Sequence, residues 1–349
     1  MDIRGLEGSI VALVTPFAED GSIDFDALGR LVDLHLGAGT DALLVLGTTG
    51  ESSTMTHEED DAVCEFVVRR VAGRIPVIAG SGSNSTETMK EKSLRLQELG
   101  AHGLLLITPY YNKTNEEGMY RHFKTVLDAV DIPCILYNVP GRTGCSIPEP
   151  VVERLARHPN AVAIKEASGS IAYASRIARH LSDDFVMYSG NDDMVVPLLA
   201  LGAKGVISVW ANVAPATVHD MVMDWMEGRT DAALATQLAS LDLIDALFCE
   251  VNPIPVKAAL EKMGYGRAIY RQPLGRISQT ADSRLTMAMK EAGLVGSGAC
   301  GGEWAHGLHR LRHRVRCTRS RAGGRHRKGF HGPAFRWVGR GGCRRRLLA

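Results

Sequence analysis

The segment AVAIKEASGS (161–170) places four apolar residues directly before a lysine and a glutamate. A short, continuous apolar run is typical of a strand that is buried on both faces, as parallel strands are. Lys165 therefore stands at the carboxyl end of a predicted buried strand, where an ammonium group is unexpected. Whether this pattern recurs along the chain decides which fold can contain the strand.

Seven further apolar runs lie between residues 9 and 209, each separated from the next by a longer amphipathic segment. The eight runs are SIVALVT (9–15), ALLVLG (42–47), IPVIAG (75–80), GLLLIT (103–108), IPCILYN (132–138), AVAIK (161–165), FVMYSG (185–190) and GVISV (205–209). Eight strand–helix units predict an α/β protein with a (β/α)8 TIM barrel. A doubly wound sheet is the alternative, but it normally has a glycine-rich phosphate turn after its first strand, and TPFAEDGS (15–22) is not one.

The strand pattern ends near residue 210. Helical patterns follow at 213–227, 230–248, 253–263 and 281–293. The first of these would be the last barrel helix, and the others would form a small C-terminal helical layer. We therefore predict a barrel over residues 1–228 and a C-terminal helical domain over residues 229–295.

Residues 296–349 differ in composition from the rest of the chain. They contain thirteen Arg, one Lys and one Glu, whereas the other 295 residues carry an excess of 12 negative charges. A basic Gly/Arg-rich tail could neutralise phosphates as a nucleic-acid-binding arm does. The abrupt change at residue 296 favours the other interpretation, a disordered extension that binds no nucleic acid.

The composition argues against membrane and secreted classes of protein. No apolar run reaches the roughly 18 residues that a membrane helix needs. The N-terminal residues show no basic segment followed by an apolar one, as a secretory signal would. The seven cysteines form no CxxC pair and no zinc-like spacing, so we predict a cytoplasmic protein.

Polar residues follow most of the predicted strands, at the end of a barrel where enzymes of this architecture place their chemistry. They occur in GTTGES (47–52), TPYYNK (108–113), YNVPGRTG (137–144), IKEASG (164–169) and SGND (189–192). None of these segments has the spacing of a metal site or a carboxylate pair suited to glycoside hydrolysis. The amine of Lys165 is therefore the candidate nucleophile.

Burial would make this amine reactive. Desolvation disfavours the charged form of lysine, and enzymes lower its pKa from ~10.4 to about 7–8 in this way. A neutral amine can attack a ketone and form an imine, and the phenol of Tyr137 could carry protons to and from the adduct. The alternatives are a structural pair between Lys165 and Glu166, and a GTTGES segment that serves only as a turn.

The order of GTTGES, TPYYNK, YNVPGRTG, IKEASG, SGND, GVISV and NPIPVK resembles the dihydrodipicolinate synthase family, within the pyruvate-dependent lyases and aldolases. The resemblance covers about residues 5–295. It implies condensation of pyruvate with L-aspartate 4-semialdehyde to 4-hydroxy-tetrahydrodipicolinate, the entry step of lysine and diaminopimelate biosynthesis. It also implies a homotetramer built as a pair of dimers. No metal or organic cofactor is expected, because a lysine imine acts as the electron sink.

The resemblance implies four catalytic residues. Lys165 matches the Schiff-base lysine, and Tyr137 matches the phenol that relays protons. Thr49 matches a hydroxyl that links this phenol to a second tyrosine. Tyr111 matches that second tyrosine, which in the family reaches into a neighbouring subunit's site.

Four further residues match the family's substrate-binding positions. Thr48 matches a residue that helps to hold the pyruvate carboxylate. Arg142 matches the arginine that receives the carboxylate of the semialdehyde, and a planar guanidinium suits that task. Gly190 and Ile207 match positions that line the pocket.

A lysine effector site is also implied, because regulated members build one partly from residues that match Ser52, His57, Asn84 and Tyr110. At two other positions of that site regulated members have His and Glu, whereas this chain has Asp60 and Thr88. Feedback inhibition by lysine therefore stays open at this point.

Two other functions stay open. A sister enzyme could use the same imine on a 2-keto-3-deoxy sugar acid or on sialic acid, although Arg142 in PGRTG suits a short acidic aldehyde better. A protein of a different class, an inactive barrel that binds nucleic acid, is favoured only by the tail.

Overall fold

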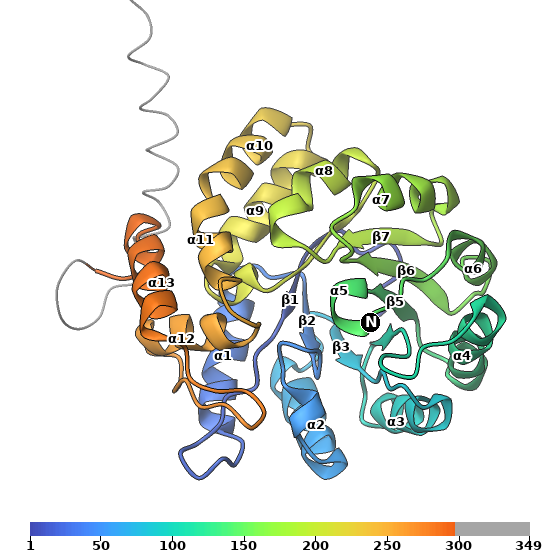
Figure 1. Cartoon of the computed structure of the whole chain (residues 1–349), viewed down its shortest axis with the longest axis horizontal. Helices are drawn as coiled ribbons and strands as arrows, with labels where there is room; N and C mark the ends of the chain where they lie inside the picture. Colours follow the sequence, from blue (N-terminus) through green and yellow to red (C-terminus); the bar gives the residue numbers. More distant parts are fainter. Residues whose placement is uncertain (297–349) are drawn as a thin grey trace, which may run out of the picture.

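The computed structural model describes residues 1–296, so the predicted basic tail over 296–349 lies outside the described residues except for its first position. Eight parallel strands form a closed barrel in sequence order, and β8 pairs with β1 to complete it (Figure 1). The strands are β1 (Gly8–Ala12), β2 (Ala42–Val45), β3 (Val77–Gly80), β4 (Gly103–Ile107), β5 (Cys134–Asn138), β6 (Ala161–Glu166), β7 (Val186–Ser189) and β8 (Gly205–Ser208). The predicted TIM barrel is confirmed, and the doubly wound alternative is wrong because a doubly wound sheet is open.

Helices surround the barrel between successive strands (Figure 1). They are α1 (Phe25–Gly37), α2 (His57–Val71), α3 (Thr86–Glu98), α4 (Glu116–Ala129), α5 (Pro140–Thr143), α6 (Glu149–Leu155), α7 (Ile171–Ile177), α8 (Val195–Ala200) and α9 (Pro215–Met226). Several begin at a capping side chain. Asp24 accepts a hydrogen bond from the amide of Ala27, and Thr56 forms a reciprocal capping box with Glu59, which satisfies amides that lack a partner inside the helix.

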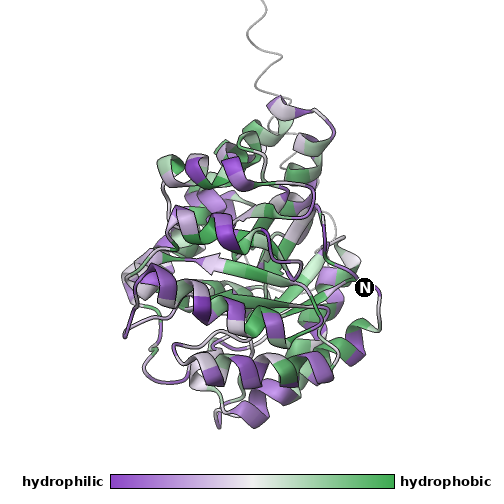
Figure 2. Ribbon diagram, turned by 90° about the vertical axis from the view of Figure 1, so that its right-hand side faces the viewer, coloured by the Kyte–Doolittle hydropathy of each residue, from purple (hydrophilic) through white to green (hydrophobic). Residues whose placement is uncertain are grey.

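Two apolar layers hold the barrel together. One fills its interior, and the other lies between the strands and the surrounding helices. Figure 2 shows hydrophobic residues along the strands and hydrophilic residues on the outer faces of the helices. Because both faces of each strand are buried, the strands consist of continuous apolar runs and not of alternating ones. Within residues 1–296 no helix combines the length and apolar character that crossing a membrane requires.

The C-terminal layer consists of α10 (Thr230–Ala239), α11 (Leu241–Leu247), α12 (Ile254–Lys262) and α13 (Gln279–Glu291). The predicted single helix over 230–248 is wrong, because it is divided at Ser240. The Ser240 hydroxyl donates to the Thr236 carbonyl, and the Ser240 amide bonds to Gln237, three residues back. Since α10 packs on α9 of the barrel, the division into domains at residue 228 stays a prediction.

Candidate active site

An irregularity in β6 decides which way Lys165 points. Cys134 on β5 pairs with Ala161, but the next residue, Ile135, pairs with Ala163, so Val162 is an extra residue in β6. A bulge of this kind shifts the alternation of side chains by one position. Val162 and Ala163 both belong to the interior cluster. Lys165 lies two residues beyond Ala163 and therefore also faces the barrel interior.

Lys165 is deeply buried, with 6% of its surface exposed. Burial lowers the pKa of its amine to about 7; the carboxylate of Asp192 opposes this shift, and the guanidinium of Arg142 adds to it. The alternative of a structural pair with Glu166 is wrong. Glu166 instead accepts hydrogen bonds from the Asn138 amide at 2.7 Å and from Ser168. The amine thus has the desolvation that a nucleophilic lysine needs.

Tyr137 lies beside this amine, because Tyr137 and Lys165 are register partners on β5 and β6. The Lys165 Nζ atom is 4.4 Å from the centre of the Tyr137 ring. Burial raises the pKa of the phenol to about 12, while Arg142 and a hydrogen bond with the Thr48 side chain lower it. The phenol therefore keeps its proton at neutral pH and can act as a proton donor.

The two threonines of GTTGES have different partners. Thr48, and not Thr49, hydrogen-bonds with Tyr137. The Thr49 hydroxyl accepts a hydrogen bond of 2.9 Å from the side-chain amide of Asn252. The predicted contact between Thr49 and Tyr137 is therefore wrong. Adjacent residues of a tight turn point in different directions, and here the amide of Gly50 bonds back to Gly47.

Of the two predicted lining positions, Gly190 lies against Lys165 and Ile207 faces the barrel interior. A side-chain carbon on Gly190 would stand 2.6 Å from the Cβ of Ala167 and 3.1 Å from the Cε of Lys165. Glycine is therefore needed there to leave room for the lysine stem. Ile207 is 1% exposed and belongs to the interior cluster.

Arg142 lies on the short helix α5 and donates a hydrogen bond of 3.3 Å from Nη2 to the backbone carbonyl of Asn252. Tyr111 lies apart from the other predicted catalytic residues. It is 90% exposed, on the loop after β4. The structure therefore brings Lys165, Tyr137 and Thr48 together, places Thr49 against Asn252, and leaves Tyr111 on the outer surface of the chain.

Asp192 is a neighbour of Lys165 for which the motifs of the sequence predict no role. It is 2% exposed, and one carboxylate oxygen accepts from the amides of Val209 and Trp210 at 3.0 and 2.8 Å. Burial raises its pKa to about 6, and these hydrogen bonds act against the rise. Its position directly after a predicted strand was the only available signal.

The C-terminal layer is attached to the mouth of the barrel by a buried ion pair. Lys257 of α12 lies 2.6 Å from Glu51 of GTTGES, with 2% and 1% of the two side chains exposed. Burial lowers the pKa of Lys257 to about 8, and Glu51 opposes the shift. Nearby, both terminal nitrogens of Arg271 contact the carboxylate of Glu59 at 2.6 Å. Partners more than 200 residues apart could not be paired from the sequence.

Of the predicted effector residues, Ser52 belongs to a different cluster of charges. Ser52 donates to the carboxylate of Asp60 at 3.0 Å, and the Lys92 ammonium contacts the same carboxylate oxygen at 2.6 Å and Ser52 at 2.8 Å. Asn84 lies next to the loop of Tyr110, since its carbonyl accepts from Asn112. His57 is exposed at the start of α2.

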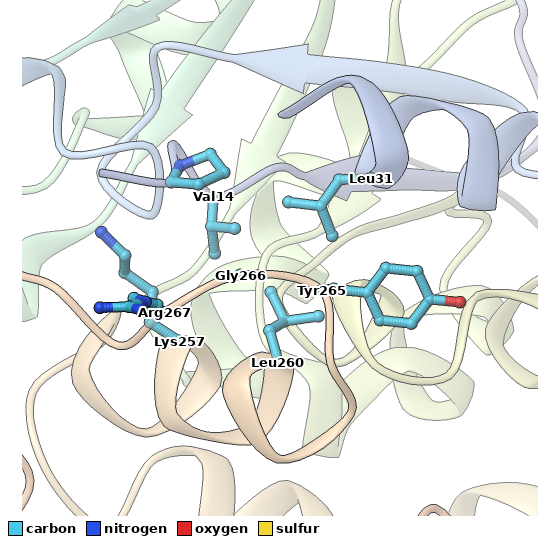
Figure 3. A pocket seen from close by; sticks show the side chains of 8 residues that line it. Val14, Leu31, Lys257, Leu260, Tyr265, Gly266 and Arg267 are labelled. Carbon is cyan, nitrogen blue, oxygen red and sulfur yellow. The ribbon is translucent and has the colours of Figure 1, made fainter. Parts of the chain in front are cut away.

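A small hollow lies between the start of the barrel and the C-terminal layer (Figure 3). It is lined by Val14, Pro16, Leu31, Lys257, Leu260, Tyr265, Gly266 and Arg267. None of these is a predicted site residue, and Lys257 is already paired with Glu51. Among residues 1–296 there is no cluster of three or more His, Cys, Asp or Glu side chains suited to a metal ion.

The profile of the Dihydrodipicolinate synthetase family matches residues 5–292. The chain belongs to this family. It is 50% identical over 288 residues to the 4-hydroxy-tetrahydrodipicolinate synthase of Caldicellulosiruptor saccharolyticus, which covers 82% of this chain and 97% of the relative. The family resemblance derived from the motifs is thereby confirmed.

Solved structures of family members show the same architecture. The dihydrodipicolinate synthase of Aquifex aeolicus superposes with a TM-score of 0.81 at 44% identity and covers 84% of this chain and 100% of that one. A chloride-inhibited dihydrodipicolinate synthase from Acinetobacter baumannii, solved in complex with pyruvate, gives a TM-score of 0.81 at 41% identity, with 83% and 100% coverage. Pyruvate is thus a ligand of a close structural relative.

Proposed function

We propose that the chain is a lyase that condenses pyruvate with L-aspartate 4-semialdehyde to give 4-hydroxy-tetrahydrodipicolinate. The observation that carries this proposal is the buried amine of Lys165, whose pKa is lowered to about 7 beside the phenol of Tyr137. Membership of the family and the pyruvate complex of the Acinetobacter relative support the choice of substrates.

In the proposed reaction the neutral Lys165 amine attacks the keto carbon of pyruvate, and loss of water gives an imine. The protonated imine withdraws electrons, so that the methyl group loses a proton and the resulting enamine attacks the aldehyde carbon. The amino group of the semialdehyde then attacks the imine carbon and displaces the Lys165 amine, which closes the ring and frees the enzyme. Tyr137 would pass protons to and from the adduct, with Thr48 as its hydrogen-bond partner. The imine supplies the electron sink, so we propose that neither a metal nor an organic cofactor takes part.

Thr49 and Arg142 would hold the two carboxylates. Thr49 does not hydrogen-bond with Tyr137, so in this proposal it takes over from Thr48 the task of holding the pyruvate carboxylate. Arg142 would take the semialdehyde, because a guanidinium can bind a carboxylate through two parallel hydrogen bonds. Gly190 and Ile207 would shape the pocket around the imine.

The proposed function is tested by offering the full chain pyruvate with a set of aldehydes in a coupled assay. We expect turnover with L-aspartate 4-semialdehyde and, after borohydride reduction with pyruvate, a mass increase of one reduced pyruvate on Lys165. Preferential turnover of a 2-keto-3-deoxy sugar acid or of sialic acid would instead identify a sister enzyme.

The rate of imine formation should depend on pH through Lys165. Only the neutral amine attacks pyruvate, and a pKa of about 7 means that the neutral form is lost as the pH falls below 7. We expect the trapping rate by borohydride to be flat above this pH and to fall about tenfold per pH unit below it. A midpoint above pH 9 would show that the amine is not desolvated in solution.

L-lysine should not inhibit the enzyme. The effector residue Ser52 is already held by Lys92, whose ammonium also neutralises the buried Asp60. The ammonium of an added lysine would therefore meet a like charge where it needs a free acceptor. Initial rates at saturating substrates, measured with and without millimolar L-lysine, check this prediction, and a dose-dependent loss of rate would contradict it.

Self-association is the remaining proposal. The exposed Tyr111 would complete the site of a second copy, as the family pattern implies, in a homotetramer built as a pair of dimers. Its 90% exposure supports this role, because a phenol of that exposure contacts little of its own chain. Analytical ultracentrifugation of the full chain tests the assembly. The cytoplasmic location stays a prediction.

A further inference from the structure

One residue of the C-terminal layer touches both of the groups that would hold substrate carboxylates. Asn252 precedes α12 and is 6% exposed. Its side-chain amide donates to the Thr49 hydroxyl at 2.9 Å, and its backbone carbonyl accepts from Arg142 at 3.3 Å. Thr49 lies in the turn after β2 and Arg142 lies on α5 after β5, and both hydrogen-bond with Asn252.

The direction of the bond to Thr49 has a chemical consequence. A hydroxyl carries one donor and two acceptor positions. Because Thr49 accepts from Asn252, its own proton is left for another acceptor, and within residues 1–296 the Thr49 side chain has no second hydrogen-bond partner. A carboxylate offers only acceptors, so a hydroxyl fixed as a donor suits it.

Asn252 also leaves one of its own atoms unsatisfied. Its Oδ1 atom is buried and has no hydrogen-bond partner among the described residues. An unpaired buried acceptor destabilises a fold, and violations of this kind occur where a residue serves a function. A residue that filled only a packing role would not need the amide.

We propose that Asn252 is a positioning residue that fixes the Thr49 hydroxyl as a donor toward the carboxylate of pyruvate. The proposal rests on the proposed function, because pyruvate must be the molecule that Thr49 meets. It concerns affinity for pyruvate and not the formation of the imine, since Asn252 does not contact Lys165.

The test compares Asn252→Ala and Asn252→Asp in the full chain. The aspartate is close in shape but only accepts, so the Thr49 hydroxyl would donate to it and be lost to pyruvate. We expect KM for pyruvate to rise about tenfold in the alanine variant and further in the aspartate variant, as for a weakened hydrogen bond to a charged group. The turnover number should change much less. Asn160→Asp is the matched control, because the side-chain amide of Asn160 donates only to backbone carbonyls, those of Leu127 and Val130, at the opposite end of β6.

A double-mutant cycle with Thr49→Val separates positioning from general damage. In the Thr49→Val background, Asn252→Ala should raise KM no further, because the hydroxyl that it orients is gone. The inference is overturned if KM in the double variant rises by the product of the two single rises, or if KM rises as much in the Asn160→Asp control as in the Asn252 variants. If the alanine variant does not fold, Asn252→Asp with and without Thr49→Val decides the question. A wild-type chain that traps no pyruvate overturns the proposed function and this inference with it; trapping together with multiplicative effects overturns the inference alone.

Discussion

Lys165→Ala should abolish the borohydride-dependent attachment of pyruvate and lower turnover by more than about 10⁴-fold, as losing a nucleophile does. The amine is the group that forms the bond, and the carboxylates nearest to it cannot replace it. The two readouts are the intact mass after reduction and the coupled turnover assay.

The fold should survive this change. The folded-state pKa of Lys165 is about 7, below the ordinary value, so the unfolded chain binds a proton more readily between pH 7 and ~10.4. Burying the amine therefore makes the wild-type protein less stable at neutral pH. Lys165→Ala and Lys165→Met remove this cost, so the melting temperature should fall no further than it does for other substitutions in the barrel interior. Lys124→Ala on the surface of α4 is the control that should keep both the label and the turnover. Labelling that persists in Lys165→Ala would assign the nucleophile to another lysine.

Tyr137→Phe should lower turnover by about 10²–10⁴-fold, the usual range for losing an acid–base group. The change removes only the hydroxyl that hydrogen-bonds with Thr48. The barrel interior stays filled because the ring remains. Imine formation should still be detectable by borohydride trapping after long incubation, so the defect should appear in the rate and not in the final extent of labelling.

Tyr188→Phe provides a close control for Tyr137→Phe. Tyr188 on β7 is the other register partner of Lys165 and is also buried, but its hydroxyl donates to the carbonyl of Leu6. Losing that hydroxyl should affect the melting temperature more than turnover. Equal losses of turnover in the two variants would mean that any buried phenol of the interior matters, and the relay role of Tyr137 would be withdrawn.

The sequence predicted the barrel well, because each strand is buried on both faces and so forms a readable apolar run. It predicted Lys165 and Tyr137 at the site for the same reason, since both close such a run. The single helix over 230–248 was predicted because helical periodicity continues across Ser240, where only a local change in hydrogen bonding divides it.

Contacts between distant segments could not be predicted. Asn252 meets Thr49 across 203 residues, and Lys257 meets Glu51 across 206. No hydrophobic periodicity in the sequence links the two members of either pair. The partner of Tyr137 could not be predicted for a different reason. The backbone of the turn sets which of two adjacent hydroxyls faces the phenol, and two identical residues carry no information on that choice.

The extra residue Val162 is accommodated by a bulge, because one step along β5 is matched by two steps along β6. If β6 continued from the pair of Cys134 and Ala161 without this bulge, every later residue of the strand would change sides, and the amine of Lys165 would turn outward, toward the helices. A lysine at position 165 is therefore not sufficient for an active chain, because the strand that carries it must also form its bulge.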